Sequence, residues 1–284
     1  ARLGVPLEAK AGLVFSVRGG AGYGGTDVPA CTAHGVALTI TPDGVRRAMA
    51  ESVMTLILAL SHRLLEQDRA TRAGEGWQRK LDLMGTGLEG RTLGLIGIGN
   101  IGGEVARLAH PFGLRIIACD PYTTPEHAAS LGVELVDRDT LLSTADIISI
   151  HCALTDETRG MIDAVCLARM KPTAFLINTA RGPIVNQRAL YDALVAGTIR
   201  GAAIDVYEQE PVDAAEPILQ LDNVIVTPHA IGWTDDWARI TGQSAVSGML
   251  AVAEGRAPNF VVNKTVLDSP LFQEKLRRIR QERG

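Results

Sequence analysis

The sequence lacks the features that mark membrane-spanning, disulfide-rich and nucleic-acid-binding proteins. Its longest apolar run covers residues 53–60, which is far too short to cross a bilayer. The four cysteines are widely spaced and form no C-x-x-C pair, so we expect no zinc site, no other metal and no disulfide framework. The net charge is only −4 without a long run of like charge, which argues against a nucleic acid or a membrane as partner. The first residues show no secretion-signal pattern, so we expect a cytoplasmic protein.

The chain does contain enough apolar material for a sizeable core, because 46% of its 284 residues are hydrophobic and 21% are charged. That length suits one large domain or two ordinary ones. Apolar residues recur at spacings of three and four from about residue 45 to residue 69, which predicts one long helix. The centre of this helix is so apolar that we expect burial on more than one side, between two domains or two subunits.

A glycine-rich stretch without periodicity, residues 73–90, follows this helix and predicts a linker at a domain boundary. From "TLGLIG" to "NVIVTPH", short apolar strands alternate with helical segments. That alternation is typical of an α/β fold with a doubly wound parallel sheet covered by helices on both faces. We therefore expect one domain over residues 81–232 and a second, discontinuous domain formed by residues 1–80 and 233–284.

The strand "TLGLIG" continues into a glycine-rich loop that opens a helix. Gly97, Gly99 and Gly102 form the pattern G-x-G-x-x-G, which is informative here because a strand precedes it and a helix follows. In a Rossmann fold the first glycine makes a tight turn, the second lets a pyrophosphate approach the backbone, and the third lets helix and strand pack closely. The pyrophosphate then lies at the helix N-terminus, where free N–H groups favour an anion.

Asp120 ends the next strand and indicates which dinucleotide binds. An acid at this position accepts hydrogen bonds from the ribose hydroxyls of NAD and repels the 2′-phosphate of NADP. The alternative is an ordinary strand–helix turn with Asp120 as a surface cap. The glycine motif, its context and the acid agree with one another, so the sequence predicts NAD as cofactor.

Polar side chains follow three later strands. Arg181 comes after "LINT", Asp205 ends "AAID" with Glu210 five residues further on, and His229 lies within "VTPHAIGW". Ligands of open α/β sheets bind at the carboxyl ends of the strands, so Arg181, Glu210 and His229 could converge beside a nicotinamide ring. Each also has a plainer interpretation, as a surface arginine, an exposed loop carboxylate and a packing histidine.

Taken together, these segments resemble the D-isomer-specific 2-hydroxyacid dehydrogenase family, which includes D-lactate, glycerate and 3-phosphoglycerate dehydrogenases. Four blocks match the family's signatures in order: "LGLIGIGNIGGEVARLAHPFGLRIIACDPY", "LINTARGPIVNQRAL", "AIDVYEQEP" and "VIVTPHAIGWT". The resemblance as a whole extends over essentially the entire chain. The resemblance implies a Rossmann-type NAD domain at 81–232 and a flavodoxin-like substrate domain formed by 1–80 and 233–284. It also implies a homodimer, with the long helix at the interface.

The resemblance assigns roles by position. Arg181, Glu210 and His229 match the catalytic trio. The remaining cofactor positions that it implies are Asn100 and Ile101 at the pyrophosphate, Cys152 and Thr179 along the cofactor cleft, and Asp205 at the nicotinamide amide. Ala21 and Gly22, in "RGGAGYGG", match the loop whose backbone N–H groups hold the substrate carboxylate.

The sequence departs from the family pattern in its first third. Family members normally have further strands before the equivalent of "AGLVFSVRGG", so the flavodoxin-like substrate domain is expected to be truncated at its N-terminus. Either the first strands are absent from this sequence, or the protein itself has an incomplete substrate domain. Gly19 and Ala21 stand where bulkier residues are common, and Ser52 stands where many members have a histidine. None of these departures affects Arg181, Glu210 or His229.

The resulting hypothesis is hydride transfer between NAD(H) and C2 of a 2-keto or D-2-hydroxy acid. Arg181 would bind the substrate carboxylate, His229 would act as acid and base, and Glu210 would hold the imidazole. An alternative is an NAD-sensing scaffold or corepressor-like protein with weak activity. A phosphorylated acid is a further possible substrate. Arg46 and Arg47, near the substrate loop "RGGAGYGG", are the only obvious candidates for binding its phosphate.

Overall fold

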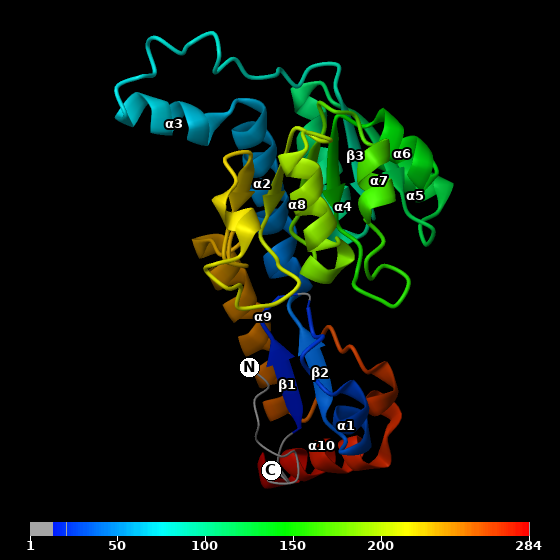
Figure 1. Cartoon of the computed structure of the whole chain (residues 1–284). Coiled ribbons are helices and arrows are strands. Elements are labelled where there is room, and N and C mark those ends of the chain that lie inside the picture. The colour runs from blue at the N-terminus through cyan, green and yellow to red at the C-terminus, as the bar shows by residue number, and fades with distance from the viewer. Residues whose placement is uncertain (1–13, 21, 284) are drawn as a thin grey trace. The chain divides into compact units, whose positions relative to one another are not determined.

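The computed structural model describes residues 14–20 and 22–283, which divide into two compact units (Figure 1). One unit contains the described residues up to Ala48 together with those from Trp233 onward, and the other spans Met49–Gly232. The first boundary between the two units along the chain therefore lies near residue 48. The glycine-rich stretch had predicted this boundary at residue 80. The reason is that the helical residues after 48 pack into the core of the larger unit.

The larger unit is built on a seven-stranded sheet in which all strand pairs are parallel, in the order β5-β4-β3-β6-β7-β8-β9. The strands are β3 (Thr92–Ile96), β4 (Arg115–Cys119), β5 (Glu134–Leu135), β6 (Ile147–Ile150), β7 (Phe175–Asn178), β8 (Gly201–Ile204) and β9 (Val224–Val226). The strand order reverses between β3 and β6, and open sheets of this kind bind ligands at the carboxyl ends of the strands beside such a point.

Helices connect the strands of this sheet. They are α4 (Asn100–Ala109), α5 (Pro125–Ser130), α6 (Arg138–Thr144), α7 (Ala164–Arg169) and α8 (Gln187–Val195), with short 3-10 turns at His110–Phe112, Gly182–Ile184 and Pro217–Gln220. Because strand side chains alternate between the two faces, Leu93 and Leu95 of β3 belong to one apolar cluster and Ile96 to another. The cluster with Leu93 and Leu95 also contains residues of α4 and α5, and the cluster with Ile96 contains residues of α6, α7 and α8. The doubly wound α/β fold predicted from the sequence is thereby confirmed.

The predicted single helix over residues 45–69 is instead two helices, α2 (Pro42–Ser61) and α3 (Leu64–Arg72), bent by 57°. Arg63 lies between them in the left-handed conformation, with φ of 52°. Its guanidinium holds this bend by donating to Glu66 at 2.5 Å and to the carbonyl oxygen of Asp82. Among the described residues no single helix is long and apolar enough to cross a membrane, and only this bent pair taken together meets such a length and composition criterion.

The apolar centre of α2 is covered by its own unit. Val53, Met54, Leu56 and Ile57 are buried, and they belong to the same cluster as the inner residues of β3 and α4. The apolar character of this helix therefore does not require a second subunit, contrary to the reasoning from sequence.

The smaller unit contains a two-stranded parallel sheet, β1 (Phe15–Arg18) and β2 (Ala37–Ile40). Its helices are α1 (Val28–Ala33), α9 (Asp235–Ala253) and α10 (Pro270–Arg283), with a 3-10 turn at Lys264–Asp268. Asn263 ties distant segments together, because its side chain accepts from the Leu38 N–H at 2.8 Å and donates to the Val36 carbonyl at 3.0 Å. Phe272 and Leu276 of α10 complete the core of this unit.

Candidate active site

The glycine loop between β3 and α4 has the backbone features that a pyrophosphate site requires. Gly97 has φ of +93°, a conformation that side chains disfavour, and a Cβ there would lie 3.0 Å from the Cys152 backbone nitrogen. A Cβ on Gly102 would lie 2.1 Å from the Gly97 carbonyl oxygen, so only glycine allows this close packing. A Cβ on Gly99 would meet no atom within 4 Å, so the loop is open at the position where a phosphate would approach. The loop therefore fits a dinucleotide.

Asp120 is held against this loop by the backbone. Its Oδ2 accepts from the Ile98 N–H at 2.9 Å, and its Oδ1 accepts from the Tyr122 N–H at 3.0 Å. Each carboxylate oxygen can accept more than one hydrogen bond, so ribose hydroxyls can still bind there. Asn100 and Ile101 form the first turn of α4, directly after Gly99.

Two further cofactor candidates lie at neighbouring strand ends. Cys152 follows β6 and Thr179 follows β7, where Thr179 is buried. Burial raises the pKa of the Cys152 thiol to about 11, so this side chain is neutral at pH 7 and is suited to contact rather than to nucleophilic attack. The preceding residue, His151, has its pKa lowered to about 4 by burial and packs beside Gly102 as a neutral ring.

The structure brings Glu210 and His229 together. The Nδ1 atom of His229 lies 2.8 Å from Oε2 of Glu210, with the two side chains 45% and 37% exposed. The other carboxylate oxygen of Glu210 accepts from the Tyr207 N–H at 3.1 Å, which fixes the direction of the carboxylate. Because Nδ1 is engaged, Nε2 is the ring nitrogen left to face a substrate.

The loop that carries His229 is anchored by Asp205, which is 2% exposed. Oδ1 of Asp205 accepts from the Thr227 hydroxyl at 2.6 Å and from the N–H groups of Ala230 and Ile231 at 3.1 and 3.3 Å. His229 itself has φ of 56°, an uncommon conformation for a residue with a side chain. Such a conformation persists where neighbours determine it, and Asp205 supplies the anchors on both sides.

Arg181 is positioned by Asn178, the fully buried last residue of β7. The Asn178 side chain accepts from the Ala180 N–H at 3.1 Å and donates to the Arg181 carbonyl at 3.0 Å, which closes the turn between them. The guanidinium donates to the Ala180 carbonyl at 2.5 Å. Across residues 14–20 and 22–283, no carboxylate pairs with it, so this cation is available to an anionic substrate.

Backbone contact joins the loops that carry the trio. A Cβ on Gly182 would lie 1.9 Å from the Tyr207 carbonyl, so glycine lets the loops after β7 and β8 touch. The Tyr207 hydroxyl donates to the Thr227 carbonyl at 3.0 Å, which links the loops after β8 and β9. Sequence reasoning missed Asn178, Tyr207 and Thr227 as positioning residues. The only signal was their position at the end of β7 or within three residues after β8 and β9.

Ala21 lies outside the described residues, and Gly22 is part of the smaller unit. No group of three or more His, Cys, Asp or Glu side chains that could hold a metal occurs in the part of the chain that the structure describes.

Comparison with known proteins identifies the family. The NAD-binding domain of the D-isomer specific 2-hydroxyacid dehydrogenases matches residues 54–230. Glyoxylate reductase from Korarchaeum cryptofilum is 38% identical over 264 residues, which cover 92% of this chain and 79% of the relative. The chain belongs to the D-isomer specific 2-hydroxyacid dehydrogenase family, as the four sequence blocks had predicted.

Two further relatives show the range of the family. D-3-phosphoglycerate dehydrogenase from Archaeoglobus fulgidus is 36% identical over 267 residues, which cover 94% of this chain but 50% of the relative. The crystal structure of D-lactate dehydrogenase from Aquifex aeolicus, complexed with NAD and lactic acid, has a TM-score of 0.78 at 28% identity and covers 85% of this chain and 76% of that chain. The protein is accordingly an NAD-dependent oxidoreductase that transfers a hydride between NAD(H) and C2 of 2-keto or 2-hydroxy acids.

Proposed function

We propose that His229, Glu210 and Arg181 carry out the reduction of a small 2-keto acid to the D-2-hydroxy acid, and the reverse reaction. The observation that supports this most strongly is the 2.8 Å contact between His229 Nδ1 and Glu210 Oε2. This contact holds the ring through Nδ1, so that Nε2 can donate a proton to the carbonyl oxygen. Bound NADH supplies the hydride to C2, and the neutral ring accepts the proton back in the oxidation direction.

Arg181 would bind the substrate carboxylate and polarise the adjacent carbonyl. A planar guanidinium suits this two-point contact, and Arg181 has no competing carboxylate among the described residues. From the family resemblance, we propose that backbone N–H groups of Ala21 and Gly22 also take part in substrate binding.

The cofactor-binding residues would be those at the carboxyl edge of the sheet. Asn100 and Ile101 would meet the pyrophosphate at the start of α4, beside the open position at Gly99. Cys152 and Thr179 would line the cleft. Asp205 would serve the nicotinamide amide through the oxygen that it does not use to anchor the His229 loop.

Asp120 supports a preference for NAD over NADP, and this can be measured directly. Replacing Asp120 with alanine removes the acceptor for the ribose hydroxyls and the charge that repels a 2′-phosphate. We expect the ratio of kcat/KM with NADH to that with NADPH to fall by about tenfold, equivalent to ~1.4 kcal/mol. Equal or better wild-type kcat/KM with NADPH would contradict this assignment.

The proposed substrate is a small unphosphorylated 2-keto acid such as glyoxylate. The support is that the Korarchaeum relative, which this chain matches over 79% of its length, is named a glyoxylate reductase. Rates with NADH and glyoxylate, pyruvate or a phosphorylated 2-keto acid test the choice. Turnover confined to the phosphorylated acid would overturn it, and absence of turnover with every keto acid would favour the NAD-sensing scaffold.

A homodimer in the cytoplasm is the proposed form of the protein. The support is an exposed apolar surface on α3 and the irregular segment after it, which Figure 1 shows leading away from α2. Leu64, Trp77, Leu81 and Met84 on this surface are 56%, 74%, 80% and 66% exposed. Exposed apolar surfaces of this kind mark protein interfaces. Light scattering should give twice the chain mass, and the double variant Trp77→Ser/Leu81→Ser should shift it towards the monomer.

A further inference from the structure

Two adjoining hollows lie at the amino edge of the seven-stranded sheet, at the opposite ends of the strands from the glycine loop and the trio. Their volumes are about 310 Å³ and about 120 Å³, and Phe175 and Arg200 line both. The larger hollow has apolar walls from Leu60, Val224 and Ile225. All the residues that line the two hollows belong to the larger unit.

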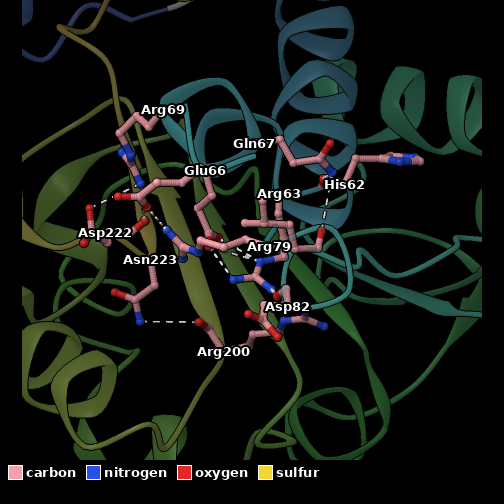
Figure 2. A network of polar contacts seen from close by, with 12 residues as sticks. His62, Arg63, Glu66, Gln67, Arg69, Arg79, Asp82, Arg200, Asp222 and Asn223 are labelled. Atoms are coloured by element: carbon pink, nitrogen blue, oxygen red, sulfur yellow. Dashed lines mark hydrogen bonds and ion pairs between the residues drawn. The ribbon is translucent and has the colours of Figure 1, made fainter. Parts of the chain in front are cut away.

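Arg200 is fixed in the shared wall. Its Nη1 donates to the Thr86 hydroxyl at 2.7 Å, and its guanidinium carbon lies 5.4 Å from the centre of the Phe175 ring. Its backbone carbonyl accepts from Nδ2 of Asn223 at 3.3 Å, a contact drawn in Figure 2. The side chain is partly buried and no carboxylate pairs with it within the described residues. The other N–H groups of the guanidinium are therefore available to a ligand.

The carboxylates around the two hollows do not neutralise Arg200, because other cations of the chain bind them. Figure 2 shows the pairs around the larger hollow, Arg63 with Glu66 and Arg69 with Asp222. The pairs are Glu66 with Arg63 at 2.5 Å, Asp222 with Arg69 at 3.2 Å, and Asp146 with Lys171 at 2.9 Å and Arg91 at 3.9 Å. Five cations thus face three carboxylates around the hollows, and Arg200 is the cation among them that has no carboxylate partner within the described residues.

We propose that the larger hollow binds a small organic acid with an apolar body, whose carboxylate pairs with Arg200. A partly buried arginine that already has one hydrogen bond is pre-organised for a charge-assisted contact to a planar carboxylate. The apolar walls then cover the body of the ligand, as in most small-molecule sites. The site goes beyond the proposed dehydrogenase reaction, because it contains no residue of the trio and none of the glycine loop.

The hollow is separated from Arg181 by the length of a strand. Phe175 begins β7, whereas Arg181 follows its carboxyl end. A strand rises by about 3.3 Å per residue, so the two positions are separated by the whole length of β7. Binding at Arg200 therefore needs neither NAD nor the keto group of a substrate.

Isothermal titration of the full-length Arg181→Met variant with 3-methylbutanoate tests the proposal. Arg181→Met removes the proposed carboxylate partner at the active site, and the probe has no 2-keto group. We expect one ligand per chain, and we expect the added Arg200→Met substitution to weaken binding by roughly tenfold or more, as expected for the loss of a charge-assisted contact. Arg188→Met is the matched control, because Arg188 is an exposed arginine paired with Asp192 and should leave binding unchanged.

Two other ligands test whether binding requires both the carboxylate and the apolar body of the probe. The neutral 3-methylbutanamide should bind at least about tenfold more weakly, and inorganic phosphate should also bind more weakly because it cannot use the apolar walls. Equal binding of the amide or of phosphate overturns the proposal, as does unchanged binding in Arg200→Met. If Arg200→Met lowers the Tm, Thr86→Val gives a second test, since it keeps the cation but removes its anchor and should still weaken binding. No turnover is measured, so failure here is distinct from failure of the proposed reaction.

Discussion

The two edges of the seven-stranded sheet use charged side chains in different ways. At the amino edge, the charged side chains other than Arg200 pair with each other within the chain, as Arg63 does with Glu66 and Arg69 with Asp222. At the carboxyl edge, Arg181 has no carboxylate partner among the described residues. There the polar contacts are made by buried residues beneath the functional ones, above all Asn178 and Asp205.

The difference shows that one sheet balances charge at its amino edge and fixes loops at its carboxyl edge. Surface ion pairs contribute little to stability and tolerate change, so the pairs at the amino edge mainly balance charge. Buried, hydrogen-bonded groups are costly to disturb, because their loss leaves partners unsatisfied. The carboxyl edge therefore fixes its loops with buried groups, and in the proposed reaction Nε2 of His229 and the guanidinium of Arg181 meet the substrate. Variants at the two edges should differ accordingly, and the predictions below are ordered from the largest expected effect to the smallest.

His229→Ala should have the largest effect on activity. Loss of a general acid typically lowers turnover by about 10² to 10⁴-fold, so we expect a fall of this size in kcat for 2-keto acid reduction with NADH. The Tm should change little, because the side chain is 45% exposed. His127→Ala, at an exposed histidine of α5, is the matched control and should be fully active. Near-normal turnover in His229→Ala would mean that this histidine only packs.

Asp205→Ala should lower both stability and activity. It leaves the Thr227 hydroxyl and two backbone N–H groups without their acceptor, and each buried unsatisfied group costs about 1–3 kcal/mol. The His229 loop should then lose its geometry, with a fall in kcat of about 10 to 10²-fold. Asp205→Asn keeps one acceptor oxygen and should recover part of both losses. Equal effects of the two substitutions on kcat would show that the charge, and not the anchor, matters.

The sequence alone predicted the features that depend on local pattern. Alternating strands and helices gave the doubly wound sheet, and the glycine spacing gave the loop at Gly97, Gly99 and Gly102, because a turn and a close approach each require glycine. Arg181 and His229 were predicted as site residues because they follow strands whose carboxyl ends share one edge. Strand ends are visible in a sequence, so residues placed there are predictable.

Features that depend on tertiary contacts were not predicted. The bend between α2 and α3 lies at Arg63, and an arginine gives no sign of a left-handed conformation. The helical period continues on both sides of it, so one helix was expected. Asp205 was assigned only to the cofactor, because a sequence does not show that its carboxylate reaches the backbone of Ala230 and Ile231. The domain boundary was misplaced because glycine-rich composition marks irregular structure and not the limit of a core.

Glu210→Gln should have a smaller effect than His229→Ala. The substitution keeps the shape of the side chain but removes the negative charge 2.8 Å from His229 Nδ1, so the imidazole loses a charge-assisted hydrogen bond. We expect kcat/KM for reduction to fall by about tenfold, because the ring is then held less firmly for proton transfer. An unchanged kcat/KM would show that the charge of the carboxylate does not matter for the reaction.

Asp146→Asn, at the amino edge, should have the smallest effect and should leave turnover unchanged. Burial alone would raise the pKa of Asp146, but hydrogen bonds from the Thr92 N–H and from Lys171 outweigh it, and the pKa lies below the ordinary value of 3.8. A depressed native pKa means that the ionised carboxylate stabilises the fold above the unfolded-state pKa, and that this stabilisation is lost as the pH falls through the native value.

The difference in Tm between Asp146→Asn and the wild type should therefore be largest at neutral pH and should shrink as the pH falls below about 4. Asp192→Asn is the control, because this exposed carboxylate has only Arg188 as an ion-pair partner in the described residues and surface pairs contribute little. A Tm difference for Asp146→Asn that is constant from neutral to acid pH would mean that shape and not charge holds this edge. In that case the contrast between the two edges would lie in packing alone.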